Sequence, residues 1–269
     1  MSDPATTYEI LAIRYAHLAR GSDRNFLGGD DHAAPMPLDY FVWLVRGQGR
    51  MLLIDTGFDD EAALRRGRQI TRPVVAGLAA AGVAPATLED IVITHMHYDH
   101  AGNLALFPRA RFHVQDEEMA FCTGRAMTHP HLRAPFHGGD VAEMVQRIFD
   151  GRVVFHAGDA ELLPGITLHQ LGGHTPGLQA VRVNTRRGPV VIASDAAHFW
   201  ANLTRAVPFP IVVDVPRYLE SQRRLLDLAP SLDHIIPGHD PQVLARFPLE
   251  AGTADIVRLD LQPKEEHRS

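Results

Sequence analysis

Four apolar segments of this 269-residue chain each lead into a histidine or an aspartate, and this repeated placement limits the folds that the chain can adopt. The residues that follow the four segments are His95, His174, Asp195 and His239. Short runs rich in Val, Ile and Leu and bounded by Gly, Pro or Asp are typical of β-strands. A sheet built from such strands can gather their terminal side chains at one rim, where loops supply the geometry. The pattern therefore predicts a sheet-based fold with a polar site at its edge.

The rest of the chain alternates strand-like and helix-like segments. The predicted strands cover residues 9–15, 38–46, 51–55, 91–94, 111–114, 166–171, 178–184, 190–194 and 234–237. The predicted helices cover residues 59–66, 73–81, 116–122, 141–149 and 216–228. The strands at 38–46 and 51–55 are separated by Gly47-Gln48-Gly49, which predicts a hairpin, whereas residues 124–140 are rich in Pro, His and Gly and predict a long loop. Many strands with a few helices favour an α/β fold with packed sheets flanked by helices, an αββα arrangement.

Composition excludes several classes of partner. The formal charge of −6, without a long basic block, gives no reason to expect nucleic acid or an anionic membrane. A single cysteine, Cys122, forbids an intrachain disulfide and is expected to be a small buried side chain without a nucleophilic role. The first residues lack the basic and apolar pattern of a secretory signal, and no apolar run is long enough to cross a bilayer. We therefore expect a soluble, cytoplasmic protein with no membrane partner.

The most polar turn of the chain follows the apolar run 91–93. It holds His95, His97, Asp99 and His100 within six positions. Neutral imidazole and carboxylate are ligands that borderline and hard divalent metals accept, so no thiolate is needed. In an extended turn His95 and His97 can point the same way, and Asp99 and His100 are then directed to a neighbouring point. The turn thus predicts ligands for more than one metal ion.

With His174, Asp195 and His239 the candidate ligands number seven, too many for one tetrahedral zinc ion. Two metals about 3.5–4 Å apart, sharing Asp195 as a bridge, would use all seven and leave positions for a hydroxide and a substrate oxygen. Chance clustering among the 16 histidines of the chain is the alternative. The recurrence of these residues behind predicted strands argues against it.

These motifs resemble those of the metallo-β-lactamase superfamily. They are H-x-H-x-D-H at 95–100, LIDTG at 53–57, GGHTPG at 172–177, SDA at 194–196 and PGHD at 237–240, and together they extend over almost the whole chain. Their order and the compact length are most similar to the N-acyl homoserine lactone lactonases. The resemblance implies one domain over residues 1–269, folded as an αββα sandwich of two mixed sheets flanked by helices. It also suggests a homodimer.

The resemblance further implies a role for each ligand candidate. His95, His97 and His174 would hold one metal, and Asp99, His100 and His239 would hold the other, with Asp195 as the bridge. The implied cofactor is two Zn²⁺ per chain, with Fe, Mn or Co as alternatives. Asp55 would be an outer carboxylate that orients the ligand turn, or simply a turn-capping residue before Gly57. The expected reaction is hydrolysis of a small lactone or ester by a metal-bridging hydroxide, with Asp99 as a candidate proton carrier.

One position departs from the lactonase pattern. Three residues after the bridging aspartate the related lactonases commonly carry a tyrosine, and this chain carries His198. A histidine can donate a hydrogen bond, carry charge near neutral pH or approach a metal. We therefore predict His198 as a catalytic residue in contact with substrate, and a solvent-facing loop histidine is the alternative.

The sequence gives fewer indications of which residues contact the organic part of the substrate. Apolar residues that could line an acyl pocket, or simply fill the core, are Phe26, Leu27, Met36, Phe41, Trp43, Phe199, Trp200 and Phe209. In the predicted loop, His129, His131 and His137 could border a pocket.

Other activities and roles are compatible with parts of the pattern. A thioesterase of the hydroxyacylglutathione hydrolase type shares the same motifs, but such enzymes normally add a helical domain, and only 30 residues follow His239. An iron-dependent persulfide dioxygenase, a diiron electron-transfer module, a nuclease and a non-enzymatic binding module are further alternatives. All seven candidate ligands are present, which argues against a binding module, and the net negative charge of the chain argues against a nuclease.

Overall fold

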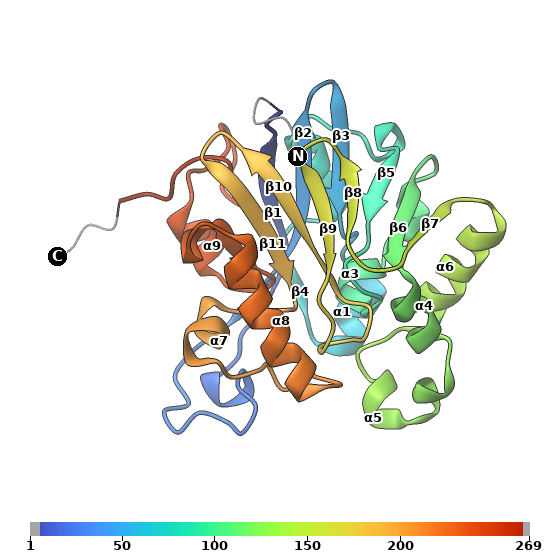
Figure 1. Ribbon diagram of the computed structural model, residues 1–269, viewed down its shortest axis with the longest axis vertical. Helices are drawn as coiled ribbons and strands as arrows, with labels where there is room; N and C mark the ends of the chain where they lie inside the picture. The colour runs from blue at the N-terminus through green and yellow to red at the C-terminus, as the bar shows by residue number, and fades with distance from the viewer. Residues whose placement is uncertain (1–5, 266–269) are drawn as a thin grey trace.

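Two β-sheets packed face to face form the centre of the protein, and helices cover their outer sides (Figure 1). The computed structural model describes residues 6–265. Within them, the larger sheet has the strand order β13-β1-β2-β3-β5-β6-β7 with β4 paired to β1, and the smaller sheet has the order β12-β11-β10-β9-β8. The strands of the larger sheet are β1 (Glu9–Leu18), β2 (Leu38–Gly47), β3 (Arg50–Ile54), β4 (Gln69–Ile70), β5 (Asp90–Val92), β6 (Arg111–Gln115), β7 (Val153–His156) and β13 (Ile256–Arg258). Those of the smaller sheet are β8 (Ala160–Leu163), β9 (Ile166–Gln170), β10 (Gln179–Thr185), β11 (Gly188–Ser194) and β12 (Ile235–Pro237).

The helices are short and several have defined caps. They are α1 (Asp60–Arg66), α2 (Val74–Ala80), α3 (Tyr98–Ala101), α4 (Asp116–Cys122), α5 (Pro130–Arg133), α6 (Gly138–Phe149), α7 (Trp200–Arg205), α8 (Val215–Leu228) and α9 (Gln242–Arg246). Helix α1 begins after Asp59, whose carboxylate accepts a hydrogen bond from the Ala62 amide at 2.8 Å. It ends at Gly67, whose φ of 63° lies in the left-handed region that glycine adopts without strain. The tight end of α1 redirects the chain into β4.

Strand β2 shows how the layers are held together. Phe41 and Trp43 are buried between the two sheets together with Val181 and Ile192 of the smaller sheet. Val42 and Leu44, on the opposite face of β2, belong to a second core under the helices. Both faces of the strand are therefore covered, which explains why its residues 40–45 are all apolar. A third, smaller core lies between the smaller sheet and α8, which crosses in front of that sheet in Figure 1.

The direction of the strands creates one common edge. β9 and β11 are both antiparallel to β10, so they run the same way, and β12 is parallel to β11. In the larger sheet β5 is parallel to β3 and β6. The loops that carry the GGHTPG, SDA and PGHD motifs therefore leave the smaller sheet on one side, as the sequence pattern predicts.

Most predicted elements are confirmed with ends displaced by a few residues, and the αββα arrangement and the β2–β3 hairpin are confirmed. The prediction of a continuous loop over residues 124–140 is wrong in part, because this segment contains α5 and the first turn of α6. Strands β4, β7, β8 and β13 were not predicted. Each is two to four residues long, and each becomes a strand only by pairing with a neighbour, a contact that no local pattern reveals. Among residues 6–265, no helix combines the length and the apolar character needed to span a membrane.

Candidate metal centre

The turn after β5 carries two polar side chains before a short helix and two within it. His95 follows the strand by three residues, His97 is the residue before α3, and Asp99 and His100 lie within α3. Asp99 and His100 thus lie in a helical turn, and the His100 ring remains close to the His95 ring, with centroids 4.1 Å apart. The Tyr15 hydroxyl donates a hydrogen bond of 2.7 Å to the Asp99 carbonyl, which fixes this helix to β1.

The seven predicted ligands converge in two groups. The potential ligand atoms of His95, His97, His174 and Asp195 lie within 4.8 Å of one another, and those of Asp99, His100 and His239 do so as well. These residues come from four loops that are distant in the sequence, and all are nearly or fully buried. The tertiary structure therefore brings together every residue that the sequence marked as a ligand.

Asp195 belongs to the first group and also faces the second. Its Oδ2 is 3.1 Å from His174 Nε2 and 3.7 Å from His95 Nε2. Its Oδ1 is 3.0 Å from His239 Nε2 and 3.3 Å from His100 Nε2. Each oxygen of one carboxylate thus faces one group, and the preceding residue, Ser194, adopts a left-handed φ of 47° at this point of the chain.

The donor atoms suit divalent metal ions. His95 Nε2 and His100 Nε2 are buried and make no hydrogen bond within the described chain, an arrangement that is costly unless a cation occupies the space between them. Burial, and next the neighbouring histidines, hold the pKa values of His95 and His97 well below the usual range. These rings are therefore neutral, the form that coordinates metals. Imidazole and carboxylate ligands without thiolate fit zinc and other first-row divalent ions.

A buried carboxylate, Asp55, orients one side of the site. Its Oδ2 accepts hydrogen bonds from His100 Nδ1 at 2.7 Å and from the Thr94 hydroxyl at 2.8 Å, while its Oδ1 accepts from the Thr94 amide at 2.7 Å. With Nδ1 engaged, His100 presents Nε2 to the site. Asp55 also has a left-handed φ of 63°, so it shapes the turn before Gly57. The residue therefore lies in a turn and contacts a ligand candidate at the same time, as both interpretations of the sequence allow.

A second buried carboxylate, Glu118 of α4, orients the other side and was not predicted. Its Oε1 accepts from the Met96 amide at 2.8 Å, and its Oε2 accepts from the Thr175 hydroxyl at 2.6 Å and the Gly177 amide at 3.2 Å. Glu118 therefore ties the turn of His95 and His97 to the loop of His174. In the sequence it stands in an acidic helix start that normally faces water, so no local signal marked it. Burial raises the pKa of this carboxyl group.

Backbone carbonyl groups orient the rings of His174 and His239. His174 Nδ1 lies 2.7 Å from the Ile211 carbonyl oxygen, and His239 Nδ1 lies 3.0 Å from that of Asp39. His97 differs, because its Nδ1 faces His174 Nε2 at 3.0 Å and is the atom directed into the site. The loop of His174 depends on Gly173, where φ is +99° and an added Cβ would lie 2.4 Å from the Tyr218 amide nitrogen.

His198 lies beside the bridging carboxylate and not on the protein surface. Its Nε2 is 3.1 Å from Asp195 Oδ2, and its ring stacks on Phe209 with centroids 3.6 Å apart and planes inclined by 6°. Burial lowers the pKa of His198 to about 3. The solvent-facing alternative for His198 is therefore wrong.

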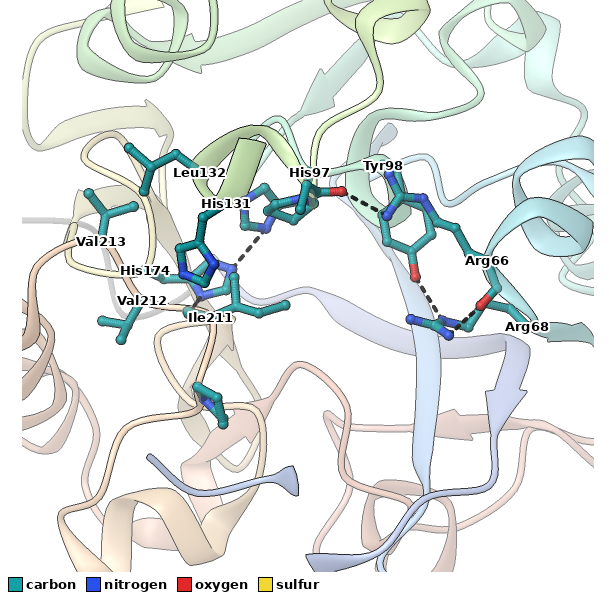
Figure 2. A pocket seen from close by; sticks show the side chains of 13 residues that line it. Arg66, Arg68, His97, Tyr98, His131, Leu132, His174, Ile211, Val212 and Val213 are labelled. Carbon is teal, nitrogen blue, oxygen red and sulfur yellow. Dashed lines mark hydrogen bonds between the residues drawn. The ribbon is translucent and has the colours of Figure 1, made fainter. Parts of the chain in front are cut away.

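A cleft of about 230 Å³ opens next to the two groups (Figure 2). His97 and His174 form its base, and the other lining residues come from the end of α1 and just beyond it, from Tyr98 of α3, from the α5 segment and from the loop before α8. They are Arg66, Arg68, Tyr98, His131, Leu132, Ala134, Pro135, Pro210, Ile211, Val212 and Val213. His131 lies at the cleft as the sequence allowed, but none of the eight predicted apolar candidates lines it. Phe41, Trp43 and Trp200 pack between the sheets, and Phe209 supports His198.

Comparison with known proteins agrees with this geometry. The family described as "Metallo-beta-lactamase superfamily" matches residues 36–244. This chain belongs to that superfamily. An N-acyl homoserine lactonase of Bacillus sp is 28% identical over 222 residues, which cover 76% of this chain and 82% of the relative.

Solved structures share the fold. A quorum-quenching N-acyl homoserine lactone lactonase superposes with a TM-score of 0.73 at 24% identity, covering 90% of this chain and 95% of the other. An N-acyl homoserine lactone hydrolase with the product N-hexanoyl-L-homoserine bound at its catalytic metal center gives a TM-score of 0.72 at 23% identity, covering 88% and 96%. The predicted resemblance to lactonases of this superfamily is thus confirmed, and the prediction of a metal-dependent ester hydrolase agrees with these relatives.

Proposed function

We propose that this protein is a dinuclear metal-dependent hydrolase that opens the ring of a lactone. The observation that carries the proposal is the position of Asp195, whose two oxygens face His174 and His239 at 3.1 Å and 3.0 Å. His95, His97 and His174 would hold one ion, Asp99, His100 and His239 would hold the second, and Asp195 would contact both. Zinc is the expected metal, with Fe, Mn or Co as alternatives that the same ligands accept.

When bound, such ions polarise a carbonyl group and lower the pKa of water enough to make a nucleophile near neutral pH. The protein supplies the positions of the groups and a cleft that is walled on one side by apolar residues. Leu132, Ile211 and Val213 would contact the organic part of the substrate, and His97 and His174 at the base of the cleft would lie beside its carbonyl group. The proposed substrate is an N-acyl homoserine lactone or another small lactone, the class that the related lactonases hydrolyse.

Two residues are proposed to act on the substrate itself. Asp99 is 9% exposed, and only its Oδ2 faces His100 and His239, both at 3.8 Å. Its Oδ1 would take the proton released by the attacking water and give it to the ring oxygen as the ring opens. His198 is held by Phe209 next to Asp195 and would position the substrate carbonyl there, the task of the tyrosine in related lactonases.

The test is a substrate panel assayed with chelator-treated protein before and after addition of zinc, together with metal counting. We expect two metals per chain, activity on lactones above that on thioesters, linear esters and β-lactams, and complete loss on chelation. A preference for glutathione thioesters would favour the thioesterase alternative. One iron per chain with oxygen uptake would contradict the proposal.

The His198→Tyr variant sharpens the assignment of that residue. If His198 positions the carbonyl, the variant retains two metals and changes kcat while KM for the same lactone changes little. Because a tyrosine could perform the same task, His198→Phe is assayed beside it, and unchanged kinetics in a folded His198→Phe protein with two metals would assign His198 a packing role only.

A further inference from the structure

The wall of the cleft carries two arginines that form no close ion pair within residues 6–265. Arg66 and Arg68, at the end of α1 and just beyond it, line the cleft on the side opposite Ile211 (Figure 2). No carboxylate of the described chain lies within 4.0 Å of either guanidinium group. By contrast, Arg65 pairs with Glu61 and Arg72 pairs with Asp255 at 2.8 Å. Half-buried cations without a counter-ion are unusual, particularly in a chain with a net charge of −6.

Tyr98 holds the two arginines in different ways. The Arg66 guanidinium lies over the Tyr98 ring, 3.9 Å from its centroid, and donates to the carbonyl oxygens of Ala134 and Phe136 at 3.0 Å and 3.1 Å. Its two terminal nitrogens are thus occupied, and its contacts fix the α5 segment. Arg66 is therefore a positioning residue of the wall.

Arg68 keeps a free donor. Its Nε donates to the Tyr98 hydroxyl at 3.0 Å, and its Nη1 donates to the Arg66 carbonyl at 2.6 Å. Its Nη2 makes no hydrogen bond within residues 6–265. Figure 2 shows this end of the guanidinium directed toward the side of the cleft where His174 and Ile211 lie. Two hydrogen bonds hold the group in place, Tyr40 and Asp99 are further polar neighbours, and the remaining nitrogen lies toward the cleft.

Arg20 extends the positive region toward His198. Its guanidinium lies 5.0 Å from the centroid of Phe209, the ring on which His198 stacks. Burial lowers the pKa of Arg20, and the nearby charge of Arg68 acts in the same direction. No carboxylate of the described chain lies within 4.0 Å of Arg20 either. Burial by itself would lower the pKa of Arg68, but Tyr40, Tyr98 and Asp99 raise it, so this guanidinium group stays charged. Because neither Arg20 nor Arg68 has a carboxylate of the described chain within 4.0 Å, an anion from outside the chain would complete the pairing.

We propose that Arg68 binds a carboxylate on the acyl side of the substrate, so that the preferred substrates are lactones with a negatively charged substituent. This proposal rests on the proposed lactone hydrolysis. A guanidinium group is planar and permanently charged, which matches the geometry of a carboxylate. The apolar side chains Leu132, Ile211 and Val213 would contact the methylene groups between the ring and the anion.

The direct test compares matched acid and amide substrates with zinc-reconstituted protein. N-succinyl-, N-glutaryl- and N-adipoyl-homoserine lactones are assayed beside the same compounds with the terminal carboxylate converted to a primary amide. We expect kcat/KM to be about 10- to 100-fold higher for the best acid than for its amide. Arg68→Gln should abolish this ratio by lowering the value for the acid alone. Arg65→Gln, with the same loss of charge three residues earlier in α1, should leave the ratio unchanged.

Two results would overturn the proposal: an acid-to-amide ratio near one for all three lengths, or an equal loss for both substrates in Arg68→Gln. If Arg68→Gln does not fold, Arg68→Lys keeps the charge without the planar group and should reduce the ratio at unchanged thermal stability. Retention of the full ratio in Arg68→Lys, together with insensitivity to salt, would also contradict the proposal.

A binding measurement separates this proposal from the proposed function. Calorimetric titration with the γ-lactam analogues of the same acid and amide requires no turnover. Tighter binding of the acid, lost in Arg68→Gln, would support the anion site even if no lactone were hydrolysed. Rapid hydrolysis of neutral lactones with equal binding of the two analogues would support the lactonase and contradict the anion site.

Discussion

The base of the site and the wall of the cleft above it are built on different principles. The base consists of the seven ligand candidates with Asp55 and Glu118, all buried or nearly so. In His100, His174 and His239, the ring nitrogen that faces away from the site has a hydrogen-bond partner inside the protein. The wall consists of side chains from Tyr98 and from three segments that join or end short helices, residues 66–68, 131–135 and 210–213, many of them half-exposed. A rigid base can keep one chemistry constant while loops vary the substrate. Mutations in the base should therefore affect metal binding and turnover, and mutations in the wall should affect selectivity.

The largest effect is expected at the carboxylate that joins the two ligand groups. Asp195→Asn removes the negative charge that faces both of them, so kcat/KM should fall on the order of 10³-fold and metal content should drop below two per chain. Plasma emission spectroscopy and kinetics measure the two quantities. Asp227→Asn, an exposed position of α8, makes the same change of charge and should have no effect. Two metals and activity within tenfold of wild type in Asp195→Asn would remove the distinction between base and wall.

A smaller effect is expected one layer further out, at Asp55. Asp55→Asn tolerates the same left-handed backbone but weakens the bond to His100 Nδ1, so zinc affinity should fall about 10- to 100-fold. Competition with a chromophoric chelator measures this affinity. The exposed Asp60→Asn should retain wild-type affinity, and if Asp55→Asn did so too, Asp55 would be a turn residue only.

Glu118→Gln tests whether the support from α4 matters as well. The substitution turns an amide NH₂ toward groups that are themselves donors, at a cost of about 1–3 kcal/mol in the free energy of unfolding. We expect a lower midpoint in thermal unfolding and a loss of roughly tenfold in zinc affinity. The adjacent Glu117, which pairs with Arg217 at the surface, supplies the control Glu117→Gln. Equal stability of the two variants would show that the buried carboxylate is dispensable.

The smallest effect is expected in the wall. Ile211 is 41% exposed, and its truncation to alanine removes apolar contact worth about 1 kcal/mol, or roughly a fivefold increase in KM for an N-alkanoyl lactone. Metal content should not change, because the Ile211 carbonyl that contacts His174 belongs to the backbone. Leu226→Ala, at an exposed position of α8, is the matched control. Loss of metal in Ile211→Ala would show that wall and base are not independent.

The sequence determined the layers and the chemistry of the base. The uninterrupted apolar run at residues 40–45 is typical of a strand covered on both sides, and His95, His174, Asp195 and His239 each follow an apolar run that ends a strand at or near that residue. These signals are local, because strand periodicity and ligand type are properties of a few consecutive residues. The departure at His198 was visible for the same reason.

Only the tertiary structure decided what surrounds the base. Glu118 and Arg68 lie in helical or turn segments where charged side chains normally face water. Glu118 contacts Thr175, 57 positions away, and Arg68 contacts Tyr98, 30 positions away. The same holds for the cleft, whose wall combines three segments distant in the sequence, while the aromatic residues that could have lined it or filled the core pack elsewhere. Burial and long-range pairing follow from how the layers meet, and no window of the sequence contains that information.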